Sequence, residues 1–374
     1  MMFMARAKEM QAKNPSVISL AGGEPDFLTP ARITSAAIKA LEAGDTHYRI
    51  GAGIPELRTA IANKLKTENG IICDENRILI TPGGKNAIYL AINAVLNYGD
   101  EAIILDPAWV SYEPIIIAAG GKPVHVKLKY EVDYRITYDQ LAKATTEKTR
   151  LLIINYPNNP TGRILHQDEA DAVEKFLLDY PNVYLLSDEV YEKIMFDNNK
   201  HISMGSKATV ADRVITVNGF SKCVAMTGWR MGYLTSSQEV FSVIYKLYQH
   251  SLTCMSGFLQ QGAVEAFNCA EETETMRKIY QSRRDKFIGE LNSIPGVCCK
   301  KPEGAFYAWV AYESKMMSAE EICEYLLKDA GVVGMPGTAY NEFDIPTMRF
   351  SFANSDEDLE DAATRIKTSI LKLF

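Results

Sequence analysis

The chain has 374 residues, of which 47% are hydrophobic and 23% are charged, so it contains ample apolar material for a packed core. It has 40 lysine and arginine residues and 47 aspartate and glutamate residues. The resulting net charge of −7 argues against binding a nucleic acid or an anionic membrane. At about 100–200 residues per domain, the length predicts two or three domains, and the expected partner is a small molecule.

The cysteine pattern indicates a reducing compartment. The seven cysteines are odd in number and show no paired Cys-x-x-Cys spacing, so they predict neither a zinc site nor a disulfide framework. We therefore expect reduced thiols, no metal and a cytoplasmic protein. The N-terminal residues reach Lys and Glu after a few apolar positions, and no run approaches the ~20 apolar residues of a membrane span, so neither export nor membrane insertion is expected.

The first two thirds of the chain predict an α/β fold. From Val17 to about Arg230, short apolar runs alternate with stretches of helical periodicity, the pattern of parallel strands joined by crossover helices. The predicted strands are Arg77–Thr81, Glu101–Leu105, Pro123–Lys127, Leu151–Asn155, Val183–Ser187 and Val214–Val217. Helices are predicted over Trp109–Ala119 and Gln167–Tyr180, the second from its amphipathic spacing. The expected result is a three-layer α/β/α domain with a mostly parallel sheet.

The remainder changes character and predicts a smaller α+β domain. A long, largely helical stretch is predicted from about Gln238 to Leu291 and is expected to connect the two parts. It is followed by a strand in AFYAWVA, a helix over Ala319–Ala330, a strand in MRFSFA and a terminal helix from Asp356. The expected division is an N-terminal segment, 1–30, packed with the small domain, a large domain over 31–270 and a small domain over 271–374.

Lys222 is the first candidate for chemistry. It follows a predicted strand and a small turn in VNGFSKCVAMTGWRMGY, so its amine is expected at the carboxyl end of the sheet, where open α/β sheets bind their ligands. A partly desolvated lysine in that place is neutral often enough to form a Schiff base with an aldehyde. An arbitrary lysine is more often a solvated surface residue, so this interpretation depends on the neighbours.

Two further strand ends carry polar side chains. Asp188, in SDEVY, follows an apolar strand, and a carboxylate there would keep a pyridine nitrogen protonated and make the ring an electron sink. Asn159, in YPNNPTG, follows the strand LLIIN, and its amide can donate to a phenolate oxygen. Taken alone, an Asp after a strand is more often a cap or a turn residue, and a turn built of Asn and Pro explains the second segment equally well. Three strand ends together nevertheless supply Asn, Asp and Lys.

The segment TPGGKNA, Thr81–Ala87, stands between a strand and a helix. Its free backbone N–H groups and the helix dipole predict an anion site of the kind that holds a phosphate. It is not a P-loop, because Leu79 and Asn86 occupy the places of the first Gly and of the Ser/Thr in that motif. Trp109, just after another strand end, could stack on a flat ring, although a lone aromatic more often packs in the core.

Eight motifs in sequence order carry a family resemblance. They are GGEPDF, THYRIGAGIPELR, PGGKNA, YPNNPTG, SDEVYE, MTGWRMGY, EGAFYAW and MRFSFA. With them the chain resembles, from about Leu20 to its C-terminus, the class I/II aminotransferases of pyridoxal-phosphate fold type I, and within these the prokaryotic-type aspartate aminotransferase subgroup. The resemblance implies pyridoxal 5′-phosphate as cofactor and amino transfer from an L-amino acid, aspartate or aromatic favoured, to a 2-oxo acid such as 2-oxoglutarate. It implies a ping-pong reaction through an internal aldimine and pyridoxamine phosphate.

The same resemblance implies the roles of the residues around the cofactor ring. Lys222 matches the Schiff-base lysine, which then moves a proton between the substrate Cα and the cofactor C4′. Asp188 matches the partner of the pyridine nitrogen. Tyr191 and Asn159 match the two groups bonded to the ring's 3-oxygen, and Trp109 matches the stacking aromatic.

The remaining matches concern the phosphate and the substrate. Gly84 and Lys85 match the phosphate-binding turn, and Arg230 matches the phosphate-binding arginine. Tyr48 matches a tyrosine that reaches the neighbouring subunit's phosphate, which implies a homodimer with shared active sites. Arg349 matches the arginine that grips the substrate α-carboxylate, with Gly23 and Asn159 beside it.

The chain departs from the family pattern at several positions, and alternative functions have to be considered. Gly219 stands where many relatives have a phosphate-binding serine, and no arginine can be assigned to a distal substrate carboxylate. The first segment, about twenty residues before GGEPDF, is shorter than in many relatives. The main rival is a pyridoxal-phosphate-dependent C–S β-lyase on the same scaffold. A non-catalytic transcriptional sensor is not expected, because the chain offers no N-terminal DNA-binding domain and its charge is negative.

Overall fold

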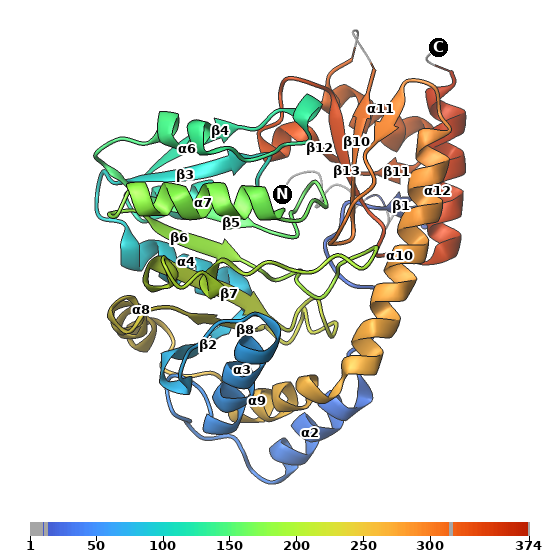
Figure 1. Ribbon diagram of the computed structural model, residues 1–374. Coiled ribbons are helices and arrows are strands. Elements are labelled where there is room, and N and C mark those ends of the chain that lie inside the picture. Colours follow the sequence, from blue (N-terminus) through green and yellow to red (C-terminus); the bar gives the residue numbers. More distant parts are fainter. Residues whose placement is uncertain (1–9, 11–13, 314–316, 373–374) are drawn as a thin grey trace.

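The structure is a computed structural model that describes residue 10 and residues 14–313 and 317–372. Residues 1–9 and 11–13 of the expected N-terminal segment lie outside the described part. Two sheets organise the chain, a larger one at the left of Figure 1 and a smaller one at the upper right, and helix α10 runs beside both. The described residues contain no helix of the length and apolarity needed to traverse a bilayer.

The larger sheet has the strand order β2-β8-β7-β6-β5-β3-β4. Its strands are β2 Ile78–Pro82, β3 Glu101–Asp106, β4 Lys122–Lys127, β5 Thr149–Asn155, β6 Tyr184–Asp188, β7 Val214–Gly219 and β8 Met231–Thr235. All neighbouring pairs are parallel except those of β8, which runs antiparallel to β2 and β7. The six predicted strands are confirmed to within two residues at each end.

Strand β8 was missed because it lies inside a motif interpreted only for its chemistry. Its Gly232 makes it a poor strand by propensity. The structure shows why a glycine stands there, since a Cβ on Gly232 would lie 2.5 Å from the backbone of Gly83 and Gly84. The strand therefore passes directly under the start of α4, Gly83–Val95.

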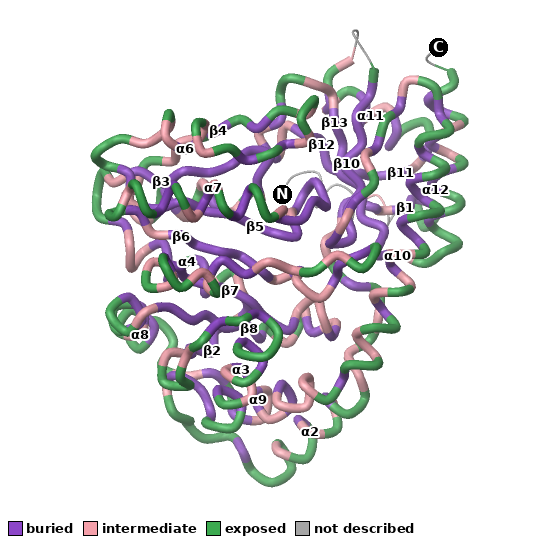
Figure 2. Tube along the Cα trace, viewed as in Figure 1, coloured by how far each residue is buried: buried purple, intermediate pink, exposed green. Residues whose placement is uncertain are grey.

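Helices cover both faces of this sheet, as its buried sequence requires. On β5, Leu151 and Ile153 pack toward α4, α5 (Tyr112–Ala118) and α8 (Gln238–Ser251). Leu152 and Ile154 pack toward α6 (Tyr138–Ala144) and α7 (Gln167–Asp179) on the other face. Because side chains alternate between the two faces of a strand, β5 contributes to both cores. Figure 2 shows the inner strands of the sheet largely buried, whereas the edge strand β4 is mostly exposed or half-buried. The three-layer α/β/α prediction is confirmed.

The single helical stretch predicted from Gln238 to Leu291 is wrong. The chain forms three helices there, α8, α9 (Gly257–Val264) and α10 (Ala270–Asn292), with a 3₁₀ turn at Glu265–Asn268. The first break has a tertiary cause: Thr253 takes a left-handed φ of 78°, and a Cβ on Gly257 would lie 2.2 Å from the Asp45 carboxylate. Helix α9 also packs against α2 (Ala31–Glu42) and α3 (Pro55–Glu68), which fixes its direction.

The smaller sheet is antiparallel, with the order β12-β13-β10-β9. Its strands are β9 Val297–Cys299, β10 Tyr307–Tyr312, β12 Met335–Pro336 and β13 Thr347–Ser351. It packs with α10, α11 (Ala319–Asp329) and α12 (Asp356–Ile370) around one core. Near the N-terminus, β1 (Ile18–Ser19) pairs with β11 (Val332–Val333), which brings the two ends of the sequence together. The predicted α+β arrangement is confirmed.

Replacing Gly232 by alanine should lower the free energy of unfolding by about 1–3 kcal/mol, the usual cost of forcing an extra carbon into a packed site. The added Cβ would meet backbone atoms of Gly83 and Gly84, which cannot swing away as a flexible side chain can. Urea denaturation followed by circular dichroism measures the change. Gly289→Ala in α10 is the matched control, because nothing lies within 4 Å of its added Cβ. Equal stability of Gly232→Ala and wild type would contradict the close approach.

Candidate active site

A cavity of about 540 Å³ lies at the carboxyl ends of β5 and β6, between the two sheets. Ten of the predicted site residues line it: Gly23, Gly84, Lys85, Trp109, Asn159, Asp188, Tyr191, Lys222, Arg230 and Arg349. Parallel strands end at the same edge of a sheet, which is why residues far apart in sequence meet here. The N-terminal segment supplies Gly23, and the smaller sheet supplies Arg349.

Asp188 is a buried carboxylate without a cation. It ends β6, and its Oδ2 accepts a hydrogen bond of 2.7 Å from the hydroxyl of Tyr112, while Oδ1 accepts one of 3.4 Å from the Val190 N–H. Among the described residues it makes no ion pair. Burial raises the pKa of Asp188 to about 6, although the hydrogen bond from Tyr112 opposes the shift. The site therefore holds an acceptor suited to a cationic N–H donor.

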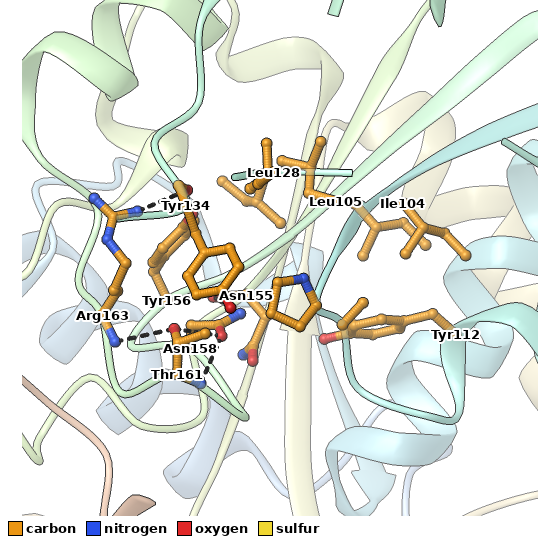
Figure 3. A pocket seen from close by; sticks show the side chains of 14 residues that line it. Ile104, Leu105, Tyr112, Leu128, Tyr134, Asn155, Tyr156, Asn158, Thr161 and Arg163 are labelled. Atoms are coloured by element: carbon orange, nitrogen blue, oxygen red, sulfur yellow. Dashed lines mark hydrogen bonds between the residues drawn. The ribbon is translucent and has the colours of Figure 1, made fainter. Parts of the chain in front are cut away.

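Tyr112 was not among the predicted site residues, although it lies only three residues after Trp109. Figure 3 shows its ring beside the backbone of the larger sheet, with Asn155 nearby. Its pKa is well above the ordinary value because the hydroxyl is buried and faces Asp188. Tyr112 therefore stays a neutral donor and orients the carboxylate.

Lys222 presents a desolvated amine in the turn after β7. Its Nζ contacts the carbonyl oxygen of Gly23 and lies 5.8 Å from the ring centroid of Tyr191. Burial lowers the pKa of this amine to about 8 from the ordinary 10.5. A substantial fraction of the amine is therefore neutral near pH 8, which nucleophilic attack on a carbonyl requires.

Arg349 is the counterpart of Asp188, a buried cation held only by neutral groups. Its Nη1 donates to the Asn159 side-chain oxygen at 2.8 Å, and its Nη2 donates to the Ala21 carbonyl at 2.6 Å. Its Nε is buried without a partner, and no ion pair forms with any described carboxylate. The guanidinium lies 4.4 Å from the ring centroid of Tyr307. Such a site suits a carboxylate on the ligand.

Asn159 and Tyr191 stand between these charges. Because the Asn159 oxygen accepts from Arg349, its amide N–H groups remain as donors. The Tyr191 hydroxyl lies 2.6 Å from that of Tyr307, and burial holds the pKa of Tyr191 well above its ordinary value. Tyr307 is the second residue at this site that was not predicted from the sequence, although it stands inside the motif EGAFYAW. Both side chains therefore supply neutral hydrogen-bonding groups to the cavity.

The first turn of α4 forms an anion cradle. Gly83 has a φ of 75°, which a glycine tolerates, and Arg230 Nη2 lies 2.5 Å from where a Cβ on Gly83 would be. The guanidinium thus packs on the helix N-terminus and adds its charge to the helix dipole. Its Nη1 donates to the Thr227 carbonyl at 2.8 Å. Lys85 extends from the same turn, and its Nζ lies 5.0 Å from the ring centroid of Trp109.

Gly219 and Tyr48, which the sequence analysis singled out, make none of the contacts described above. A Cβ on Gly219 would lie 2.9 Å from the Met231 carbonyl oxygen, so a serine does not fit there without a backbone shift, whereas Ser221 lines the cavity. Tyr48 does not line the cavity, and its side chain is 87% exposed.

Taken together, these residues match one kind of ligand. An unpaired buried carboxylate suits a protonated ring nitrogen, the α4 cradle suits a phosphate, and the indole of Trp109 suits a flat ring. The Lys222 amine suits an aldehyde, and Arg349 suits a second molecule that carries a carboxylate. A phosphorylated heterocyclic aldehyde fits the polar groups that the cavity presents.

Comparison with known proteins extends over nearly the whole chain. The sequence profile of the family "Aminotransferase class I and II" matches residues 15–366. An aspartate aminotransferase of Musicola paradisiaca is 39% identical over 368 residues, 98% of this chain and 92% of that protein. Aromatic-amino-acid aminotransferase 2 of Thermococcus litoralis is 39% identical over 94% of this chain and 91% of its own. The crystal structure of an aspartate aminotransferase from Rhizobium meliloti has a TM-score of 0.94 at 34% identity, covering 98% of this chain and 94% of that one.

Replacing Asp188 by asparagine should stabilise the protein when no small molecule is bound. A raised pKa means that folding favours the protonated carboxyl, so this contribution to stability is full below about pH 4 and is lost as the pH rises to about 6. At pH 7.5 we expect Asp188→Asn to gain up to about 3 kcal/mol, from roughly two pKa units at 1.36 kcal/mol each. Near pH 4 the gain should vanish.

Urea denaturation of the ligand-free protein at both pH values measures this difference. Asp179→Asn is the matched control, because the Tyr138 hydroxyl and Lys175 lower the pKa of that exposed carboxylate. A difference between Asp188→Asn and wild type that is the same at both pH values would show that the buried charge is not the cause.

Proposed function

Because this chain belongs to the class I and II aminotransferases, we propose that it transfers the amino group of aspartate or an aromatic L-amino acid to a 2-oxo acid such as 2-oxoglutarate. Membership brings pyridoxal-phosphate fold type I and pyridoxal-5′-phosphate-dependent transamination with it. The observation that carries the residue assignments is the meeting of Asp188, Lys222 and Arg349 around one cavity, each without an ion-pair partner in the described part of the chain.

The residues around the ring divide the work of binding. Asp188 would hold the proton of the pyridine nitrogen, with Tyr112 keeping the carboxylate in place. Asn159 and Tyr191 would donate to the 3-oxygen of the ring, and Trp109 would stack on its face. Gly84, Lys85 and Arg230 would bind the phosphate at the start of α4, where Arg230 already packs on Gly83. When bound, pyridoxal phosphate supplies an aldehyde for amine exchange and an electron-withdrawing ring.

Lys222 and Arg349 act on the substrate. The neutral amine of Lys222 takes the proton from the substrate Cα and later returns it, a role for which a pKa of about 8 is well matched. Arg349 binds the α-carboxylate in a two-bonded fork, and its Nη2 also lies 3.4 Å from the carbonyl oxygen of Gly22, next to Gly23 in the cavity wall. Fixing the carboxylate decides which bond at Cα is weakened, and it selects proton removal over loss of CO₂.

The direct test of the function is an assay with about twenty L-amino acids, pyridoxal phosphate and 2-oxoglutarate, followed by glutamate release. We expect glutamate from aspartate or from aromatic donors, and ping-pong kinetics, since donor and acceptor use the same carboxylate site. Release of ammonia and pyruvate from one substrate without an acceptor would instead establish the C–S β-lyase.

Subunit arrangement and location are part of the proposal. The exposed side chain of Tyr48 has no role in its own subunit's cavity, which supports a homodimer in which it reaches the neighbour's phosphate. Ile50, 56% exposed on the same segment, gives that face apolar character. All seven cysteines are free thiols, which supports a cytoplasmic protein.

The division of the chain into working parts is also a proposal. We assign residues 31–270 to the cofactor-binding domain and 271–374 to the small domain, with the first 30 residues packed on the latter. The pairing of β1 with β11 and the bond from the Ser351 N–H to the Leu20 carbonyl, 2.7 Å, support this for the described part of that segment.

Lys222 should be the lysine that carries the cofactor covalently. Borohydride reduction of the holoenzyme, followed by digestion and mass spectrometry, should leave the cofactor mass on the peptide that contains Lys222. In Lys222→Ala no peptide should retain it, because no other amine of comparable desolvation lines the described cavity. Lys85→Ala is the control and should still be labelled. Labelling of another lysine in the wild-type protein would refute the assignment.

A further inference from the structure

A buried polar chain joins the larger sheet to the smaller one behind Arg349. The Trp309 Nε1–H donates to the Tyr134 hydroxyl at 2.9 Å, and that hydroxyl donates to Glu342 Oε2 at 2.9 Å. Tyr134 lies between β4 and α6, Trp309 lies on β10, and Glu342 follows the 3₁₀ turn Gly337–Tyr340. All three side chains are buried. Tyr134 is therefore the member of this hydrogen-bonded chain that comes from the loop after β4, at the edge of the larger sheet.

The surroundings of Tyr134 hold it in one place. Its backbone has a left-handed φ of 51°, directly after Asp133 at 58°, and such non-glycine conformations persist only where the surroundings impose them. Its carbonyl accepts from Arg163 Nη1 at 3.0 Å, an interaction drawn in Figure 3. Arg163 is itself fixed by two bonds to the buried Glu169, of 3.1 and 2.9 Å. The hydroxyl of Tyr134 is thus a fixed point.

At the other end the chain reaches Arg349 through aromatic rings. Trp309 is paired with Arg349 across β10 and β13, so the two side chains lie on the same face of the smaller sheet. The ring of Tyr340 packs edge-on against Trp309, with 5.6 Å between centroids, and the Arg349 guanidinium lies 5.2 Å from the Tyr340 centroid. The backbone carbonyl of Tyr340 accepts from the backbone N–H of Ala108 at 3.2 Å, next to Trp109 in sequence.

We propose that Tyr134 is a positioning residue for the substrate carboxylate: through Trp309 and Tyr340 it sets the place of the Arg349 guanidinium. The inference rests on the proposed role of Arg349. Within the described residues Glu342 makes no ion pair, and its Oε1 accepts from the backbone N–H of Asp344 at 3.0 Å. Loss of the Tyr134 hydroxyl would leave both the Trp309 N–H and Glu342 Oε2 unsatisfied. The rings of Trp309 and Tyr340 would then repack, and the Arg349 guanidinium that packs against Tyr340 would shift.

The consequence is selective. Amino and oxo acid substrates both present a carboxylate to Arg349, so both should bind less well. The contacts of Tyr134 include neither Lys222 nor Asp188, so proton transfer at Cα and cofactor binding should be preserved. A role in general stability would affect cofactor retention as well, which separates the two.

The test compares Tyr134→Phe with the wild-type holoenzyme and with the control Tyr138→Phe, whose hydroxyl donates to Asp179 on the protein's exterior. For Tyr134→Phe we expect the KM of both donor and acceptor to rise about threefold to tenfold, the effect of one lost buried hydrogen bond, with kcat within about twofold. The dissociation constant of pyridoxal phosphate should not change. Glu342→Gln, which keeps an acceptor for Tyr134, should resemble wild type more closely than Glu342→Ala.

A direct binding measurement complements the kinetics. The α-methyl analogue of the preferred amino donor has no Cα proton to lose, so titration of the holoenzyme with it, followed by absorbance, reports substrate binding alone. Its dissociation constant should rise in Tyr134→Phe by the same factor as KM and stay constant in Tyr138→Phe. Unchanged values in Tyr134→Phe, or weakened cofactor binding alongside raised KM, would overturn the positioning role. A wild-type enzyme that transfers no amino group would instead contradict the proposed function.

Discussion

Two opposite charges are buried in one cavity of this protein, and neither forms an ion pair with any residue that the structure describes. Asp188 is held by a tyrosine hydroxyl and a backbone N–H, and Arg349 by an amide oxygen and backbone carbonyls. Burying unpaired charge destabilises a fold, which survives only because the rest of the core is well packed. In the function we propose, this cost in stability has a purpose, because a cationic ring and an anionic substrate would find their partners already in place.

The fold provides this arrangement through backbone geometry. Parallel strands β5, β6 and β7 deliver Asn159, Asp188 and Lys222 to one edge of the sheet, where the side chains of the smaller sheet meet them. Neither glycine at the start of α4 and below it leaves space for a side chain: a Cβ on Gly232 would meet the backbone of Gly83 and Gly84, and a Cβ on Gly83 would meet the Arg230 guanidinium. The Ala21–Gly23 backbone closes the cavity by binding Arg349 and contacting Lys222.

Neutral hydrogen-bonding groups hold the ligand-facing side chains in position. Tyr112 orients Asp188, Tyr307 orients Tyr191, and the chain from Tyr134 to Tyr340 backs Arg349. Since these hydroxyls are buried, each must find a partner, and that requirement fixes the side chains on which they act. Rigid support of this kind is what allows a charged group to keep its place before a ligand arrives.

Local pattern alone determined the strands of the larger sheet, because a two-residue alternation of apolar positions is a property of the segment itself. It also placed Asn159, Asp188 and Lys222 at strand ends. The family resemblance gave the cofactor and proposed Arg349 and Arg230 as ligand-binding residues, and the structure places both in the same cavity. The interpretation failed where long-range contacts decide: the helix predicted from Gln238 to Leu291 is broken by the left-handed Thr253 and by the contact of Gly257 with Asp45, and β8 was hidden by its glycine. Tyr112 and Tyr307 were missed for the same reason, because the sequence around a tyrosine does not show which side chain its hydroxyl will bond in the folded protein. The sequence by itself thus determined the elements and the types of reactive group. Only the tertiary structure decided which groups touch and which charges stay unpaired, because burial and contact depend on segments far apart in the chain.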